Sequence, residues 1–320
     1  LFATGLSPDV TTSTFWANQA GSNGGAVALL ETAVGPEFPA RIKETEFWIN
    51  TAGESGGAIW TSDSGAFYLN RILVVLNAAE GDGGGIWISG GQPSNTFVRA
   101  WHNSAEGDGG GLYISGSNGG LTRKSSFGGN QAGGSGGGAV HKDPEASHSI
   151  YNNRYIENTA TSGGGLVIDN DPSKRSSVSN IDVFGNTGGG VSIVNSAEAK
   201  LVNAIISWND GAAVTADEAS TGATLKFINT YENDNVAGGE LTSLDDNDAG
   251  NIKNNISADP LYTRAERDEN PIGDFLKLTS ESPCLNTGKA DISNRDGTRS
   301  HYGSYGGPNA EGGDEDGDGV

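Results

Sequence analysis

Short apolar stretches of three to five residues recur along the chain, and each is bounded by Gly, Ser or Asn. Within them, aliphatic or aromatic residues often alternate with residues of another kind, as in Ile86-Trp-Ile-Ser. Such runs are typical of β-strands separated by turns, whereas a helix needs a longer stretch with a helical period. The pattern therefore predicts an all-β protein and no substantial helix.

Asparagines recur with these stretches at gaps of 32, 27, 26, 27, 28, 28, 23 and 24 residues. They are Asn18, Asn50, Asn77, Asn103, Asn130, Asn158, Asn186, Asn209 and Asn233. A period in this range indicates repeats that bury their apolar faces only against their neighbours. We expect a parallel β-solenoid of about ten coils with loop insertions, in which the Asn side chains form a hydrogen-bonded ladder.

Within each coil, residues two apart point to the same face of the strand. After the Gly pairs, the inward positions are predicted to hold Val27 and Leu29, Ile86 and Ile88, Leu112 and Ile114, and Leu166 and Ile168. The outward position between them holds Trp60, Trp87 and Tyr113 in successive coils. A second outward column, two residues before the repeated Asn, holds Trp16, Trp48 and Trp101.

Exposed, contiguous aromatic side chains on a soluble protein indicate a contact surface. These columns could pack against another protein, stack on the sugar rings of a glycan, or be covered by long insertions at 31–46 and 62–71. The sequence leaves these three alternatives open.

Composition limits the possible partners. The net charge of −21 argues against nucleic acid and anionic membrane surfaces, because binding to them depends on Lys and Arg. The lone Cys284 provides neither a disulfide framework nor a thiolate metal cluster. No apolar run reaches the length of a membrane span, so we expect no membrane insertion. The continuous repeat predicts one domain over residues 1–308, followed by an acidic linker over 309–320.

The repeats resemble the FxxN and GGA(I/L/V) motifs of polymorphic outer-membrane proteins. The FxxN motif is matched by Phe15-Trp-Ala-Asn18, Phe47-Trp-Ile-Asn50 and Phe127-Gly-Gly-Asn130, and each is followed by Gly-Gly-Ala and an aliphatic residue. The resemblance covers about residues 15–168 and weakens after Asn186. It implies the right-handed parallel β-helix of pectin-lyase-like bacterial surface proteins.

Residues 254–308 resemble the closing segment of secreted bacterial β-helix proteins, on the strings NNISADPLY and SPCLNTG. The chain departs from that family where an acidic ending is replaced by Gly303-Ser-Tyr-Gly. The final residues resemble the start of a thrombospondin type 3 calcium repeat, which implies Ca²⁺ ligands at Asp314, Asp316 and Asp318. Both resemblances imply an extracellular or cell-surface setting.

A duplicated Ala-Glu-Gly-Asp-Gly-Gly-Gly run is predicted to place Glu80 above Glu106 and Asp82 above Asp108. Four carboxylates this close repel one another unless a cation bridges them, and oxygen ligands favour Ca²⁺. Solvated turn residues are the alternative.

An enzymatic function is the second candidate, because the predicted fold also supports polysaccharide lyases and glycoside hydrolases. The residues best suited to acid–base chemistry are Lys142 and Asp143, with Asp169 and Asp171 one coil further on. Ordinary turn chemistry also explains the Asp-Pro pairs at Asp143 and Asp171.

The histidines His102, His148 and His301 lack metal-ligand spacing and are expected at turns or on the surface. We therefore expect a non-catalytic structural or adhesive module, such as a bacterial adhesin, that associates with copies of itself, other surface proteins or polysaccharide.

Overall fold

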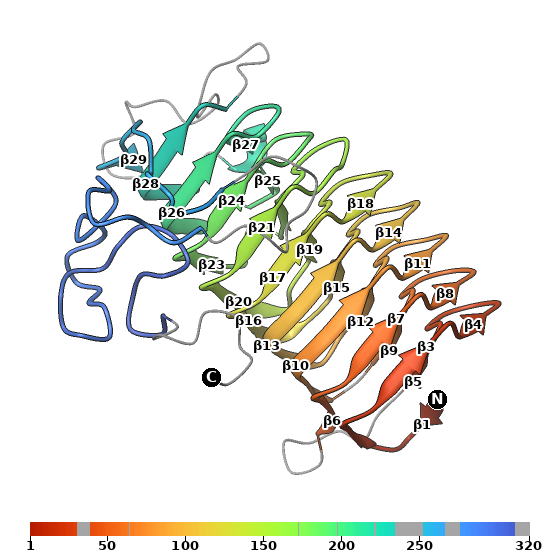
Figure 1. The fold of residues 1–320 in the computed structure, drawn as a ribbon. Helices are drawn as coiled ribbons and strands as arrows, with labels where there is room; N and C mark the ends of the chain where they lie inside the picture. The colour runs from red at the N-terminus through yellow and green to blue at the C-terminus, as the bar shows by residue number, and fades with distance from the viewer. Residues whose placement is uncertain are drawn as a thin grey trace.

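The computed structural model describes residues 1–30, 39–63, 65–171, 173–196, 198–220, 222–233, 252–265 and 276–310. The chain forms an all-β parallel solenoid of about eight turns (Figure 1). Within the described ranges, the only helical element is the 3-10 turn η1, Glu218–Ser220. The fold class is confirmed. The count of ten coils was too high because residues 259–265 and 276–310 lie along the side of the solenoid and add no further coils.

The coils contribute to three sheets in which every strand pairing is parallel. Sheet A contains β1 (Phe2–Thr4), β5 (Val27–Leu30), β9 (Ile59–Ser62), β12 (Ile86–Ser89), β15 (Leu112–Ser115), β19 (Ala139–Lys142), β22 (Leu166–Asp169), β25 (Val191–Val194) and β27 (Val214–Ala216). Sheet C contains β4 (Gln19–Ala20), β8 (Thr51–Ala52), β11 (Ala78–Ala79), β14 (Ser104–Ala105) and β18 (Gln131–Ala132).

Sheet B is the largest. It contains β2 (Asp9–Thr11), β3 (Thr14–Trp16), β6 (Ala40–Lys43), β7 (Glu46–Trp48), β10 (Ala66–Val75), β13 (Gln92–Trp101), β16 (Asn118–Arg123), β17 (Ser126–Gly128), β20 (Ala146–Tyr151), β21 (Arg154–Ile156), β23 (Ser176–Ser179), β24 (Asp182–Phe184), β26 (Lys200–Ser207), β28 (Thr224–Tyr231) and β29 (Ile252–Lys253). The segments 31–46 and 62–71 are therefore not simple insertions, because they include β6 and the start of β10.

The core is a stack of apolar side chains, one layer per coil. All eight predicted inward residues of sheet A are at most 1% exposed. Phe15 and Phe47 stack in parallel with ring centroids 5.0 Å apart. Removing this apolar surface from water is the main stabilising contribution, and each coil receives it only when its neighbours are present.

The predicted asparagine ladder is present. In each step the backbone N–H and side-chain Nδ2 of one Asn donate to Oδ1 of the next, as Asn77 does to Asn103 at 3.0 and 2.9 Å. The ladder is continuous from Asn18 to Asn233. The residue before each ladder Asn adopts the left-handed backbone conformation at the corner, as Leu76 does with a φ of 57°. The Asn side chain forms the hydrogen bond to the next coil.

The closing segment, residues 254–265 and 276–310, packs on the outer face of sheet B. Leu276 contacts Ile156 and Phe184, and Tyr262 and Ala265 pack around them. A second cluster buries Cys284 and Tyr302 against Ile205. The segment therefore covers sheet B only over its C-terminal coils.

Candidate contact surfaces

The aromatic column on sheet A has the predicted register. Trp87 pairs with Trp60 on one side and Tyr113 on the other, with ring centroids 5.4 and 6.3 Å apart and nearly parallel planes. Tyr113 is only 8% exposed and packs with Val140 and Val167. Because each ring covers part of its neighbour's face, this column presents mainly ring edges to solvent.

The column on sheet B is more open. Trp16 is 61% exposed and stacks on Trp48 with centroids 6.0 Å apart. The corner residues beside this column, Ile49 and Leu76, are 42% and 52% exposed. We call Trp16, Trp48, Ile49, Leu76 and Trp101 the sheet B patch.

The composition of the sheet B patch is typical of protein contact surfaces. The φ of 57° at Ile49 belongs to the corner position that Ala17, Leu76 and His102 also occupy in their coils. Trp101 lies beside Arg99, whose guanidinium carbon is 6.0 Å from the ring centroid. Trp and Arg are the residues most enriched at energetically dominant interface positions.

The closing segment covers the continuation of this column. Trp101 is followed up the stack by Gly128, Ile156 and Phe184, and the last two are at most 2% exposed. The same longitudinal face is thus apolar along its length. The closing segment buries its C-terminal half, whereas Trp16 in its N-terminal half is exposed.

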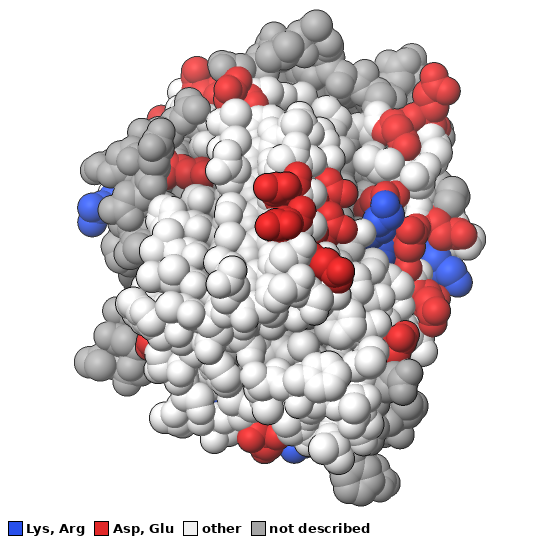
Figure 2. All heavy atoms as spheres, turned by 90° about the vertical axis from the view of Figure 1, so that its right-hand side faces the viewer, with Lys and Arg blue, Asp and Glu red and all other residues white. Residues whose placement is uncertain are grey.

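The duplicated acidic turn is shaped by backbone hydrogen bonds. Asp82 Oδ1 accepts from the backbone N–H of Asp108 at 2.8 Å, and Asp108 Oδ1 accepts from Ser135 N–H at 2.6 Å. The side chains of Glu80 and Glu106 are exposed on successive coils. Figure 2 shows acidic side chains gathered on this flank of the molecule.

No set of three or more His, Cys, Asp or Glu side chains suited to a metal ion occurs in the described part of the chain. The Ca²⁺ site at Glu80, Asp82, Glu106 and Asp108 stays a prediction. The ligands predicted at Asp314, Asp316 and Asp318 lie outside the described residues.

The candidate catalytic residues are only partly brought together. Lys142 Nζ and Asp169 Oδ2 form an ion pair of 3.6 Å, and Asp169 also accepts from Asn195 Nδ2 at 3.1 Å. Asp171 binds its own turn through the N–H and hydroxyl of Ser173, and these hydrogen bonds lower the pKa of its carboxyl group. Asp143 is an exposed corner residue with a φ of 44°.

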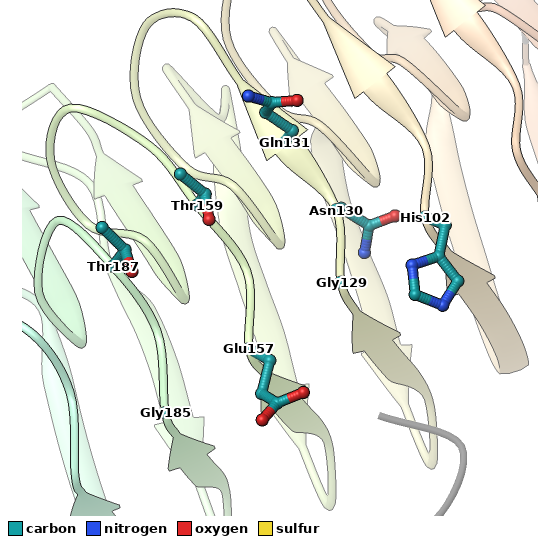
Figure 3. A pocket seen from close by; sticks show the side chains of 8 residues that line it. All are labelled: His102, Gly129, Asn130, Gln131, Glu157, Thr159, Gly185 and Thr187. Carbon is teal, nitrogen blue, oxygen red and sulfur yellow. The ribbon is translucent and has the colours of Figure 1, made fainter. Parts of the chain in front are cut away.

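Sequence reasoning missed a polar groove on the flank between sheets B and C. Figure 3 shows His102 and Glu157 on either side of Gly129, with Gln131 and the hydroxyls of two threonines along the hollow. Its volume is about 690 Å³, and its lining residues are His102, Gly129, Asn130, Gln131, Glu157, Thr159, Gly185 and Thr187.

The groove exists because glycines replace side chains at two corners. Gly129 and Gly185 flank Glu157 on successive coils, and a Cβ at Gly129 would lie 2.6 Å from His102 Nδ1. Partial burial lowers the pKa of the His102 imidazole. A second hollow of about 860 Å³ extends the groove toward the N-terminal coils and shares Gln131 with the first. The glycines in the corner column were the sequence signal for this groove.

The prediction that His148 lies at a turn or on the surface is wrong. His148 is 1% exposed and His141 2% exposed, with ring centroids 4.6 Å apart inside the solenoid. The hydroxyls of Ser117 and Thr122 lie 3.5 and 3.3 Å from the two ring nitrogens of His148. Both ring nitrogens of His141 lack a hydrogen-bond partner among the described residues. The alternation of inward and outward side chains along β19 and β20 places both rings inside the solenoid. In the sequence the two histidines appeared only as isolated polar residues.

Comparisons with protein-family models, curated protein sequences and solved structures gave no match to this chain. No helix in the described ranges has the length and apolar character needed to cross a membrane.

Proposed function

We propose that this chain is a non-catalytic structural and adhesive module of an extracellular or cell-surface protein, and that it associates with copies of itself through the sheet B patch. The observation that carries this proposal is the uneven covering of sheet B. Trp16, Ile49 and Leu76 are exposed where the closing segment does not reach. Contiguous exposed apolar side chains on a soluble protein mark contact surfaces.

The proposed extracellular or cell-surface location is supported by the resemblance of the repeats to those of known surface proteins. The FxxN and GGA(I/L/V) repeats resemble those of polymorphic outer-membrane proteins and pectin-lyase-like surface proteins. A solenoid suits a rod that positions surfaces along its length.

Sedimentation velocity of the 320-residue chain over a range of protein concentrations tests self-association. We expect Ile49→Thr with Leu76→Ser to weaken it by about tenfold or more, because truncated central interface residues remove most of the binding energy. Leu6→Ser is the matched control, since Leu6 is an exposed apolar residue (66%) outside the sheet B patch. A wild-type chain that stays monomeric throughout would refute the proposal.

Glycan contact is the second candidate function, and the groove in Figure 3 favours it. Hydroxyl groups recur one coil apart at Thr159 and Thr187, and Gln131 adds an amide and Glu157 a carboxylate that could bind the hydroxyls of an extended neutral oligosaccharide. Retention on a panel of immobilised neutral glycans tests this function. Loss of retention in Glu157→Gln with Thr159→Val would support it.

A polysaccharide lyase or glycoside hydrolase remains the alternative class, with Lys142, Asp143, Asp169 and Asp171 as the residues to test. The ion pair of Lys142 and the turn contacts of Asp171 provide structural roles for these side chains. Unsaturated products or new reducing ends from a polysaccharide panel, lost in Lys142→Ala, would establish this class instead.

A further inference from the structure

Cations are frequent on the outer side of sheet B, and five of them follow one another over four successive coils. They are Arg71, Arg99, Arg123, Lys124 and Arg154, which we call the basic strip. The strands β10, β13, β16, β17, β20 and β21, which lie in four successive coils, contain no Asp or Glu. The whole chain has 40 acidic and 19 basic residues, so this segregation is opposite to its average composition.

Aromatic rings and hydroxyl groups contact the side chains of the basic strip, and Arg154 also lies near the buried carboxyl group of Asp182. The Arg71 guanidinium carbon and Lys124 Nζ lie 5.7 and 5.4 Å from the centroid of the Phe97 ring. Arg123 donates to the Tyr151 hydroxyl and to Thr96 Oγ1, both at 3.2 Å. Among the residues that the structure describes, no carboxylate forms an ion pair with Arg71, Arg99 or Arg123. Within that described part of the chain, no carboxylate neutralises these three guanidinium groups.

Carboxylates gather on another side of the solenoid, at the turns that follow sheet C. Glu54, Glu80 and Glu106 are exposed there on three successive coils, and we call these three residues the acidic edge. The segments 50–62, 77–89 and 103–115 contain no Lys or Arg. Figure 1 places sheet C along one edge of the solenoid and strands β13, β16 and β20 toward the opposite edge.

The two rows share the same spacing. Both rise by one coil at a time, because the parallel register aligns each coil directly on the next, as Val75 pairs with Trp101. Two copies with parallel axes would therefore bring three coils that carry strip residues opposite the three coils that carry Glu54, Glu80 and Glu106. A polyanion with another repeat would lose this register.

We infer that the basic strip of one copy binds the acidic edge of a second copy, side by side and in the same orientation. This inference rests on the proposed self-association and names its two surfaces. The contact is heterologous, with different faces on opposite sides of each copy, so it adds further copies into an open row. The sheet B patch borders the basic strip and is buried in the same contact. Charge complementarity of this kind mainly fixes orientation and register.

Charge reversal with exchange tests the inference on the full chain. Arg71→Glu/Arg99→Glu/Arg123→Glu makes both surfaces acidic, and Glu54→Lys/Glu80→Lys/Glu106→Lys makes both basic. We expect each variant alone to associate about tenfold more weakly or worse in sedimentation velocity at low ionic strength, because like charges face each other. An equimolar mixture should recover association, since every contact is again between opposite charges.

The control is Lys174→Glu/Arg175→Glu/Lys289→Glu. Each Lys or Arg to Glu substitution changes the net charge by two. The control and Arg71→Glu/Arg99→Glu/Arg123→Glu therefore both have a net charge of −27, compared with −21 for the wild type. The control should associate like the wild type. Far-ultraviolet circular dichroism checks folding, and Arg71→Glu alone, at an exposed corner, gives a second readout if the triple variant misfolds.

The outcomes separate the two proposals. A monomeric wild type would refute self-association and this inference with it. A wild type that associates while Glu54→Lys/Glu80→Lys/Glu106→Lys associates equally well would overturn the inference alone. Failure of the folded mixture to recover association would overturn it too.

Discussion

The Tyr262 hydroxyl donates a 2.8 Å hydrogen bond to Oδ1 of Asp182, which joins the closing segment to the outer face of the solenoid. The other carboxylate oxygen of Asp182 accepts from Ser304 N–H at 2.6 Å. Asp182 is fully buried, although it lies on the outer side of sheet B. A buried carboxylate thus fixes how the closing segment lies on the coils.

Burial of Asp182 gives the first prediction. Burial raises the pKa of this carboxyl above its ordinary value of 3.8, despite hydrogen bonds from Ser304 and Tyr262 and the nearby charge of Arg154. The folded state then binds the proton more tightly than the unfolded state, so this group's stabilising contribution falls as pH rises from about 4 through the folded pKa. Asp182→Asn should remove this component, measured as the difference from the wild type in urea unfolding across that window. An identical pH dependence in both proteins would contradict the prediction.

The buried histidines predict a dependence of opposite sign. Burial lowers the pKa of His148 to about 4 and that of His141 well below its ordinary 6.5. The unfolded chain takes up protons first on acidification, so the stability from these groups is present above about pH 6.5 and is lost as pH falls below it. With both groups titrating, the slope approaches about 2.7 kcal/mol per pH unit.

Replacement of one imidazole tests this slope. His141→Leu should lower the number of protons taken up on unfolding by about one, and the slope falls in proportion. Leucine fills the apolar space and removes the titrating group. Equilibrium unfolding between about pH 7 and 5 measures the effect. His102→Leu is the comparison, and it should reduce the slope less, because His102 is only half-buried and its pKa is lowered less than that of His141. A wild-type slope in His141→Leu would show that the pair does not control acid stability.

The asparagine ladder predicts a large cost for a central substitution. Asn103 is 1% exposed, donates to Asn130 Oδ1 and Val74 O at 2.9 Å, and accepts from Asn77. Asn103→Ala leaves several buried groups unsatisfied and should lower the free energy of unfolding by about 3 kcal/mol. Asn118→Ala, at an exposed strand position outside the ladder, should change it by less than about 1 kcal/mol. Urea denaturation compares the two, and equal effects would contradict a structural role for the ladder.

Close approach between coils predicts a difference between two glycines. A Cβ at Gly84 would overlap the backbone carbonyl of Ser104 in the next coil, whereas a Cβ at Gly21 meets no atom within 4 Å. Gly84→Ala should therefore separate neighbouring coils and cost more than about 3 kcal/mol, while Gly21→Ala should stay within about 0.5 kcal/mol. Thermal unfolding of the two variants checks this, and a stable Gly84→Ala protein would refute the coil spacing.

The repeat made much of the fold predictable. Because parallel coils place residues one period apart next to each other, the order of residues alone predicted that Trp87 neighbours Trp60 and Tyr113 and that Asn77 bonds to Asn103. The same alternation predicted the buried positions of sheet A.

The repeat did not predict contacts between residues that are not one period apart in the sequence. The burial of Ile156 and Phe184 comes from Leu276, about a hundred residues away in the chain. The groove beside Glu157 requires two corner glycines on neighbouring coils, and its significance appears only when those corners are stacked.

The sequence by itself determined the strands, their parallel stacking and the side chains of each column, since a regular period converts spacing along the chain into adjacency in space. Only the tertiary structure decided which columns stay in contact with water and which coils the closing segment covers. The reason is physical: exposure depends on what packs from elsewhere in the chain, and a local pattern carries no information about that distant packing.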